Sequence, residues 1–319
     1  MRLYTKKNSV PIQEDNKNDL GFGSKVTERT NTRFINRDGS FNVIREGLPF
    51  LQSLSLYHSL ITMSWLQFYG SILLAYFVVN TIFAIGYFLC GPNALYGSDA
   101  VTVQQRFFDS FFFSVQTLAT IGYGKISPQG IVANILVTIE ALTGLLGVAL
   151  ATGLSFARFS RPSAKIAYSQ NAIIAPYKDG TAFEFRILNQ RKNQLFDVDV
   201  TVVLSKMETH QEKKVRKFYP LTLERSKVVF FPLHWTIVHP IDEQSPLKEM
   251  TSEDLKNGDV EVFILLRATD ETFSQTVHSR SSYKHHEIIV GAKFGDMFIS
   301  NNEQQVSIDA RRLHNIDKV

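Results

Sequence analysis

Thr117-Leu118-Ala119-Thr120-Ile121-Gly122-Tyr123-Gly124-Lys125 is the stretch of sequence that decides the fold. Near its end, two glycines alternate with larger residues. Consecutive backbone carbonyls can point to one side only if alternate residues adopt conformations that a Cβ disfavours, and glycine adopts them readily. Such a loop can coordinate a cation through its carbonyl oxygens. The alternative is a surface turn in which the glycines only supply flexibility, so the flanking sequence has to decide.

Charged residues are absent from one long part of the chain. Between Gly47 and Ser98 there is no Asp, Glu, Lys or Arg, whereas residues 165–319 are charged at the density of a soluble domain. One half is therefore predicted to lie in a membrane and the other in water. The net charge of +4 is mild and no basic, aromatic stripe is present, which argues against a nucleic-acid partner. A single cysteine, Cys90, excludes an intrachain disulfide and a cysteine-rich metal site.

The apolar runs predict two membrane spans. Leu66–Cys90 is the first, ended by Gly91-Pro92-Asn93, and Ile131–Ala157 is the second. The uncharged run would make roughly 78 Å of helix, far more than a hydrocarbon core of about 30 Å requires. We therefore expect its more polar first part, Leu48–Trp65, to lie along the membrane surface as an amphipathic helix.

Between the two spans lies an apolar run that is too short to cross a bilayer. Phe107–Thr120 contains Asp109, and a span needs about twenty residues, so a re-entrant segment is predicted. Asp109 is expected near the amino end of a short helix, where a carboxylate accepts unpaired N–H groups. The opposite end of that helix would direct partial negative charge below the glycine loop, which suits a cation.

A span, a short re-entrant helix, a Thr-Ile-Gly-Tyr-Gly loop and a second span follow each other in the order that a potassium pore requires. One loop supplies a quarter of a carbonyl ring, so four chains are expected around one axis. Arg158, Arg161 and Lys165 follow the second span and place that end in the cytoplasm. We thus expect a multi-pass protein of the cell membrane, inner or plasma, with both termini cytoplasmic.

Beyond Pro162 the pattern changes to short alternating runs separated by turn signals. This pattern predicts an all-β sandwich, with no Gly-x-Gly-x-x-Gly nucleotide loop. The predicted strands are Phe183–Leu188, Val198–Leu204, Val228–Leu233, Trp235–Val238, Val260–Leu266 and Glu287–Val290.

The chain resembles the prokaryotic inward-rectifier potassium channels of the KirBac type over residues 36–319. The resemblance rests on the loop, the span pattern, Phe159-Ser160-Arg161-Pro162, His239–Leu247 and Arg280-Ser281-Ser282-Tyr283. It implies a homotetrameric pore and an immunoglobulin-like cytoplasmic domain. The implied organisation is a mobile cytoplasmic tail (1–35), an N-terminal strand and slide helix (36–65), the pore domain (66–160) and the cytoplasmic sandwich (161–319).

The resemblance also assigns roles to individual residues. Gly144 matches the hinge of the inner helix, Val148 and Phe156 match positions that narrow the inner pore, and Ser274–His278 matches a cytoplasmic constriction loop. Without the resemblance, Val148 and Phe156 could equally be lipid-facing or packing residues. The ion-binding filter residues are Thr120, Ile121, Gly122, Tyr123 and Gly124.

The sequence departs from the family pattern at three places, and these departures bear on rectification, filter stability and origin. Strongly rectifying relatives have an acidic residue at the position of Val148, so weak rectification is expected. Relatives brace the filter with a Glu and Arg pair, whereas this chain has Gln116 and no Arg directly after the filter. The cysteine pair that flanks the pore in animal members is missing, which favours a bacterial protein.

Glu140 is the one ionisable residue of the second span, and a carboxylate there costs about 2.5–3.5 kcal/mol on insertion scales. It is expected either to line the cavity or to hydrogen-bond behind the filter. Four basic residues near the inner surface are candidates for anionic or phosphoinositide headgroups, or only fix topology: Arg45, Arg158, Arg161 and Lys165.

No nucleophile, base and orienting group can be picked out, so no enzyme is predicted. No cofactor is expected, and no metal beyond permeating K⁺, because the histidines lack metal-ligand spacing. The alternative function is a membrane-anchored β-sandwich that binds a partner or acts as a scaffold and does not conduct.

Overall fold

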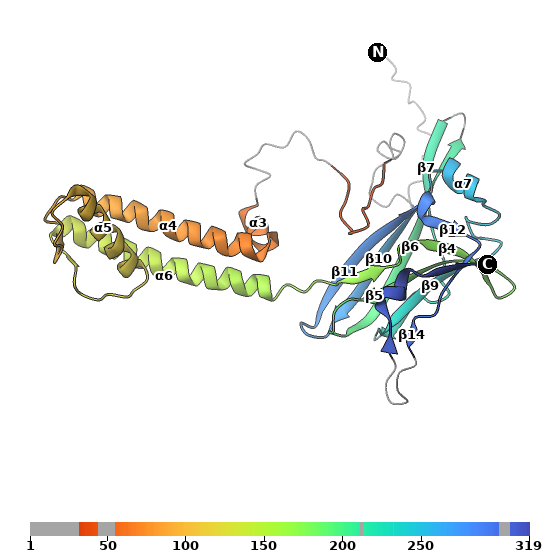
Figure 1. Ribbon diagram of the computed structural model, residues 1–319. Helices are drawn as coiled ribbons and strands as arrows, with labels where there is room; N and C mark the ends of the chain where they lie inside the picture. The colour runs from red at the N-terminus through yellow and green to blue at the C-terminus, as the bar shows by residue number, and fades with distance from the viewer. Residues whose placement is uncertain (1–31, 44–54, 211–212, 232, 300–306) are drawn as a thin grey trace, which may run out of the picture. The chain divides into compact units, whose positions relative to one another are not determined.

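The computed structural model describes residues 32–43, 55–210, 213–231, 233–299 and 307–319. The chain forms two compact units, Glu46–Arg161 and Met1–Arg45 with Pro162–Val319, which we call the pore unit and the sandwich unit (Figure 1). Residues 1–31 of the expected tail (1–35), the first part of the expected slide helix and the lipid candidate Arg45 lie outside the described residues.

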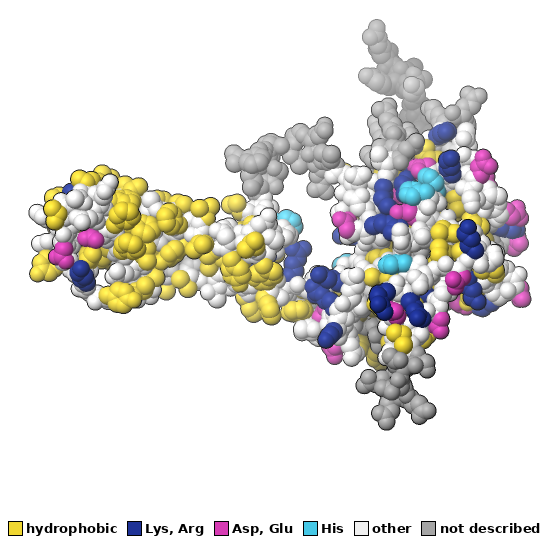
Figure 2. Space-filling model, viewed as in Figure 1, with side chains coloured by type: hydrophobic (Ala, Val, Ile, Leu, Met, Phe, Trp, Pro, Cys, Tyr) yellow, Lys and Arg dark blue, Asp and Glu magenta, His cyan; other side chains and the backbone are white. Residues whose placement is uncertain are grey.

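Within its described residues, the pore unit contains four helices: α3 (Leu56–Thr62), α4 (Trp65–Leu89), α5 (Val103–Leu118) and α6 (Ile131–Phe159). The helices α4 and α6 are long and apolar enough to cross a membrane, in agreement with the two predicted spans. Most of their apolar surface faces outward, and Figure 2 shows hydrophobic side chains over the pore unit. Such a surface suits a hydrocarbon solvent.

The helix starts follow from capping chemistry. Ser64 caps α4 and Thr102 caps α5, each in a reciprocal box with a glutamine three residues later. The expectation that Asp109 lies at the amino end of α5 is therefore wrong, since the Thr102 box starts the helix further upstream. Asp109 lies inside α5 and accepts a hydrogen bond from Ser98 Oγ at 2.6 Å. Ser64 also explains why α3 ends at Thr62, because a new helix starts directly after it.

In the described residues the sandwich unit is built around two five-stranded sheets, which agrees with the β-sandwich predicted from the sequence. The first has the order β11-β10-β6-β7, with β8 paired to β6, and the second has the order β12-β4-β5-β3, with β9 paired to β5. The strands of the first sheet are β6 (Leu195–His210), β7 (Lys213–Pro220), β8 (Lys227–Phe230), β10 (Glu261–Asp270) and β11 (Gln275–Lys284). Those of the second are β3 (Ile166–Tyr168), β4 (Ala172–Tyr177), β5 (Gly180–Asn189), β9 (His234–Ile241) and β12 (Ile288–Val290).

Alternate residues of the central strands fill one core between the two sheets, as the two-residue period of a strand requires. The largest contributions come from Phe183, Phe185 and Ile187 on β5, Val198, Val200, Val202 and Leu204 on β6, and Val262, Ile264 and Leu266 on β10. Smaller elements complete the fold: β1 (Leu95–Tyr96), β2 (Ser127–Pro128), α7 (Ser252–Asn257), η2 (His285–Glu287), β13 (Ala292–Phe294), β14 (Phe298–Ile299), β15 (Ser307–Ile308), η3 (Ala310–His314) and β16 (Ile316–Lys318).

Candidate ion-conduction site

Backbone hydrogen bonds join the start of the glycine loop to the last turn of α5. The N–H of Thr120 donates to the carbonyl of Thr117 at 3.0 Å, and the N–H of Ile121 donates to the carbonyl of Gln116 at 2.7 Å. The first residues of the loop therefore have no freedom that is independent of α5. Any change in the position of this helix is passed to the loop.

The backbone of the loop alternates as its sequence predicts. Thr120, Gly122 and Gly124 have φ of 55°, 58° and 77°, whereas the residues between them do not enter the left-handed region. A β-branched residue such as Thr120 rarely adopts positive φ, so its conformation is strained. Alternation between left-handed and ordinary residues turns successive carbonyls to one side, which is the geometry of a cation-binding filter.

The side chains of the loop are poorly covered by their own chain. Ile121 is 47% exposed and Tyr123 is 78% exposed. A Cβ added at Gly122 or Gly124 would meet no atom within 4 Å. The loop is thus an open strand of carbonyl groups, and a single chain does not enclose an ion.

Beyond the loop, the chain pairs with the segment that follows α4. β1 and β2 pair as a short antiparallel ladder, and Gly97 lies so close to the carbonyl oxygen of Lys125 that a Cβ could not fit. Lys125 and Asp99 form an ion pair at 3.4 Å, but both side chains are at least three-quarters exposed. Such an exposed ion pair contributes little to stability. It therefore does not replace the Glu and Arg pair that is expected to brace the filter of relatives.

The inner helix contacts α5 at Gly144. This glycine is buried, and a Cβ there would collide with the carbonyl oxygen of Leu118, the last residue of α5. Val148 and Phe156, one and three turns further along α6, are 63% and 70% exposed. Their own chain leaves most of both side chains uncovered, as expected of gate residues in a pore made of several chains.

Glu140 lies one turn before Gly144 and is completely buried. Its carboxyl group contacts the hydroxyl groups of Tyr87 on α4 and Ser114 on α5. The structure therefore places Glu140 behind the pore helix and not in a cavity. This position favours hydrogen bonding behind the filter over cavity lining, the other role considered from the sequence.

Arg158 holds the inner end of α6 against the corner between α3 and α4. Its guanidinium lies over the rings of Trp65 and Phe68, at 4.7 and 4.6 Å from their centroids. It also donates hydrogen bonds to the carbonyls of Leu60 and Met63, the second at 2.6 Å. These contacts occupy Arg158 within the chain, which makes it a poor candidate for lipid binding.

The other described lipid candidates differ from Arg158. Arg161 and Lys165 are both exposed. Among the described residues, neither has an ion pair with an acidic side chain. They remain candidates for an anionic headgroup.

The segment expected as a constriction loop has a defined structure. Ser274, with φ of 51°, ends the turn between β10 and β11, and residues 275–278 already belong to β11. Only the first residue of Ser274–His278 therefore lies in a turn.

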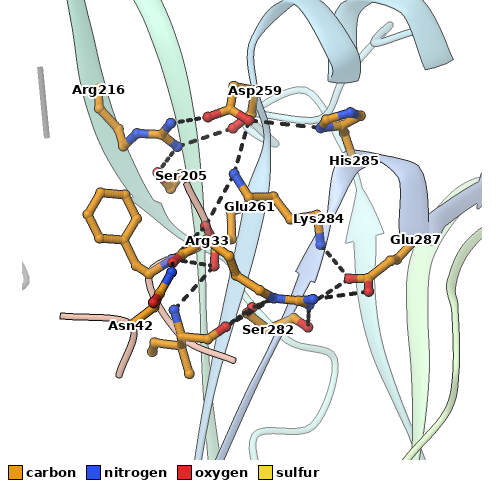
Figure 3. A network of polar contacts seen from close by, with 12 residues as sticks. Arg33, Asn42, Ser205, Arg216, Asp259, Glu261, Ser282, Lys284, His285 and Glu287 are labelled. Atoms are coloured by element: carbon orange, nitrogen blue, oxygen red, sulfur yellow. Dashed lines mark hydrogen bonds and ion pairs between the residues drawn. The ribbon is translucent and has the colours of Figure 1, made fainter. Parts of the chain in front are cut away.

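Sequence analysis missed an anchor for the N-terminal segment, shown in Figure 3. Arg33 donates two hydrogen bonds to the carboxylate of Glu287, at 3.1 and 2.6 Å, and one to the carbonyl of Ser282 at 2.5 Å. Arg37 donates to the same carboxylate at 2.7 Å. The anchor site includes the Arg280–Tyr283 run of β11, which sequence analysis had singled out only for its resemblance.

A second carboxylate of the anchor is fully buried. Glu261 accepts the backbone N–H groups of Phe34 and Ile35 at 3.2 and 3.5 Å, and Lys284 Nζ lies 3.5 Å away (Figure 3). Phe34 and Ile35 pack in a small apolar cluster with Val203, Phe218 and Phe263. Charge and packing together fix the segment on the sandwich unit.

Glu287→Gln is expected to loosen this anchor. Burial alone would raise the pKa of Glu287, but hydrogen bonds from Arg33, from the Lys284 N–H and from Arg37 outweigh it, so the pKa is lowered. A lowered pKa gives stability that is present above the unfolded value of about 4.3 and is lost as pH falls through the folded value. Losing hydrogen bonds to a charged group costs the anchored segment about 1.5–3 kcal/mol of stability. This loss corresponds to roughly 10- to 100-fold faster amide exchange.

The measurement is hydrogen exchange of the Phe34 and Ile35 amides in the full chain, corrected for intrinsic rates. Protection in wild type should fall as the pH drops below the unfolded pKa of about 4.3, and Glu287→Gln should already show the roughly 10- to 100-fold faster exchange at pH 7. Glu243→Gln is the control, because Glu243 is 86% exposed in its pair with Lys248. Equal protection in wild type and Glu287→Gln at pH 7 would contradict the anchor.

Two membrane-length helices, a short pore helix and a carbonyl loop define the class of the protein as a membrane-embedded potassium pore. A family model described as "Ion channel" matches residues 88–161, and one described as "Inward rectifier potassium channel C-terminal domain" matches residues 166–319. The chain is 42% identical over 289 residues to the inward rectifier potassium channel Kirbac3.1 of Paramagnetospirillum magnetotacticum, covering 89% of this chain and 95% of that relative. The chain therefore belongs to the prokaryotic inward-rectifier potassium channel family.

More distant relatives include two human proteins. The ATP-sensitive inward rectifier potassium channel 8 is 26% identical and the match covers 90% of this chain and 74% of the relative. The inward rectifier potassium channel 18 is 25% identical, with 92% and 73% covered. The resemblance stated from sequence is thus confirmed, and K⁺ is the permeant ion. The family also points to a channel and not to an enzyme.

Proposed function

We propose that four copies of this chain form a weakly rectifying potassium pore in the cell membrane, with both termini in the cytoplasm and with modulation by anionic lipid. The observation that carries the proposal is the backbone alternation at Thr120, Gly122 and Gly124. Carbonyl groups turned to one side replace the hydration shell of an ion only when they form a closed ring.

The exposure of the loop supports assembly of several chains. Tyr123 is 78% exposed, and such an aromatic surface needs a partner. The exposed faces at Val148 and Phe156 support the same arrangement, because rings of such residues would narrow the inner pore. Four copies match the number of loops in a potassium filter.

Flux of ⁸⁶Rb⁺ into vesicles that contain the purified protein tests the function. Uptake that K⁺ competes with and barium blocks is expected. Protein that forms tetramers but passes neither ion would leave the non-conducting scaffold as the better explanation.

The lipid part is tested in the same vesicles, made with and without an anionic lipid. The two exposed cations Arg161 and Lys165 should carry the response, so the double variant Arg161→Gln, Lys165→Gln should respond less than wild type. A response that is unchanged in the double variant would reject these residues as the site.

Weak rectification follows from the apolar side chain of Val148. Spermine added from the cytoplasmic side should block only weakly, because no carboxylate at this position attracts a polyamine. Val148→Asp should make the block stronger by about tenfold or more, whereas Val148→Asn, of similar volume and neutral, should not. Current–voltage curves in planar bilayers measure the effect, and steep block of the wild type at depolarised voltage would contradict it.

A further inference from the structure

Four buried polar side chains meet where the three long helices of the pore unit cross. Asn80 and Tyr87 come from α4, Ser114 from α5 and Glu140 from α6. Their exposed fractions are 0% for Asn80, Ser114 and Glu140 and 1% for Tyr87. Polar groups at this depth are costly unless all of them are hydrogen-bonded.

The contacts form one chain of hydrogen bonds. Tyr87 Oη lies 2.5 Å from Glu140 Oε2, Ser114 Oγ contacts Glu140 Oε1, and Ser114 Oγ lies 3.1 Å from Asn80 Oδ1. Asn80 Nδ2 donates to the carbonyl of Tyr76 at 2.7 Å, which fixes the amide so that its oxygen faces Ser114. Among the described residues, no Lys, Arg or His forms an ion pair with Glu140.

Counting protons decides the state of the carboxyl group. The three contacts between these four side chains need three protons, whereas the hydroxyl groups of Tyr87 and Ser114 supply two. Asn80 presents only an acceptor to Ser114, so Ser114 has to donate to Asn80. The contact between Ser114 and Glu140 is then a hydrogen bond only if the carboxyl group donates, which requires a neutral carboxylic acid.

The cluster acts on the part of α5 that holds the filter. Ser114 and Leu118 are one turn apart on α5, and their partners Glu140 and Gly144 are one turn apart on α6. These two contacts fix the last turn of the pore helix. That turn contains Gln116, whose carbonyl accepts the N–H of Ile121.

We propose that Glu140, as a neutral carboxylic acid, is a positioning residue that holds the pore helix and thereby sets the ion selectivity of the filter. The proposal rests on the proposed ion-binding role of Thr120–Gly124. It gives this chain a substitute for the Glu and Arg brace that Gln116 cannot form. The substitute lies between the helices of one chain and not beside the filter.

Two variants of one residue test the proposal in ⁸⁶Rb⁺ flux vesicles with K⁺ or Na⁺ as competitor. Glu140→Gln keeps a donor and an acceptor without charge, so it should retain the wild-type preference for K⁺ within about twofold. Glu140→Ala removes both and should reduce the preference by about tenfold, the size of one lost buried hydrogen bond. Thermal stability of the assembled protein is measured in parallel, because a purely structural role would lower stability without changing selectivity.

Ser114→Ala removes only the partner on α5 and replaces Glu140→Ala if that variant does not assemble. Unchanged selectivity in the alanine variant tested would overturn the positioning role. A Glu140→Gln variant that behaves like Glu140→Ala would overturn the neutral state of Glu140. An infrared difference spectrum of wild type minus Glu140→Gln that shows no band of a protonated carboxyl group would overturn it as well. Wild type that passes no K⁺ would instead contradict the proposed function.

Discussion

We expect Gly122→Ala to abolish potassium flux while the protein still assembles. Gly122 has φ of 58°, where an L residue other than glycine costs roughly 1–2 kcal/mol. No atom lies within 4 Å of the added Cβ in the chain itself, so the effect comes from the backbone. A filter that relaxes to negative φ would turn a carbonyl away from the ion, and in the proposed ring of four chains each copy would carry the same defect.

A matched control separates strain from loss of the ion site. Gly91 has φ of 102°, and a Cβ there would also meet no atom within 4 Å, but it lies at the end of α4 outside the filter. Gly91→Ala should therefore cost similar backbone strain and keep flux. Rubidium uptake and size-exclusion chromatography measure the two properties, and near-normal uptake in Gly122→Ala would reject the filter.

Much of this architecture can be predicted from the sequence, because it depends on residues that are close together along the chain. The spans come from long apolar runs, and the bounds of α4 and α6 differ from the predicted ones by at most two residues. The positive φ of Gly122 and Gly124 follows from the glycine spacing, whereas that of Thr120 does not. These features depend on neighbours within a few residues, so one sequence contains them.

The features that sequence analysis missed depend on pairing across the fold. β11, with the sequence QTVHSRSSYK, has little apolar alternation, and its pairing with β10, from Glu261 opposite Lys284 to Asp270 opposite Gln275, makes it a strand. β7, with the basic sequence KKVRKFYP, was missed in the same way, and its pairing with β6 makes it a strand.

Side-chain roles show the same limit. Arg158 is a lipid candidate from its position after the second span, but its stacking on Trp65 cannot be inferred from the sequence. The partners of Glu140 lie 26 and 53 positions away along the chain. Sequence spacing can therefore mark such residues as unusual without choosing their partners.

Gly144→Ala should disrupt the filter from behind. The resemblance assigns a hinge to Gly144, but the added Cβ would collide with the carbonyl oxygen of Leu118, which is backbone and cannot rotate away. Helix propensity alone would favour alanine by about 0.8–1.0 kcal/mol. The collision has to displace the end of α5, and we expect loss of most K⁺ flux and of K⁺ preference over Na⁺ in the channels that still conduct.

Gly147→Ala is the matched control one turn further along α6, because it gains the same helix propensity and its Cβ would meet no atom within 4 Å of the same chain. A hinge role and a contact role make different predictions for Gly144→Ala. A stiffened hinge would change how often the pore opens but leave selectivity intact, since the filter would not move. Displacement of Leu118 changes selectivity itself. Single-channel recordings under K⁺ and Na⁺ gradients distinguish the two, and wild-type selectivity with altered open probability would favour the hinge over the contact.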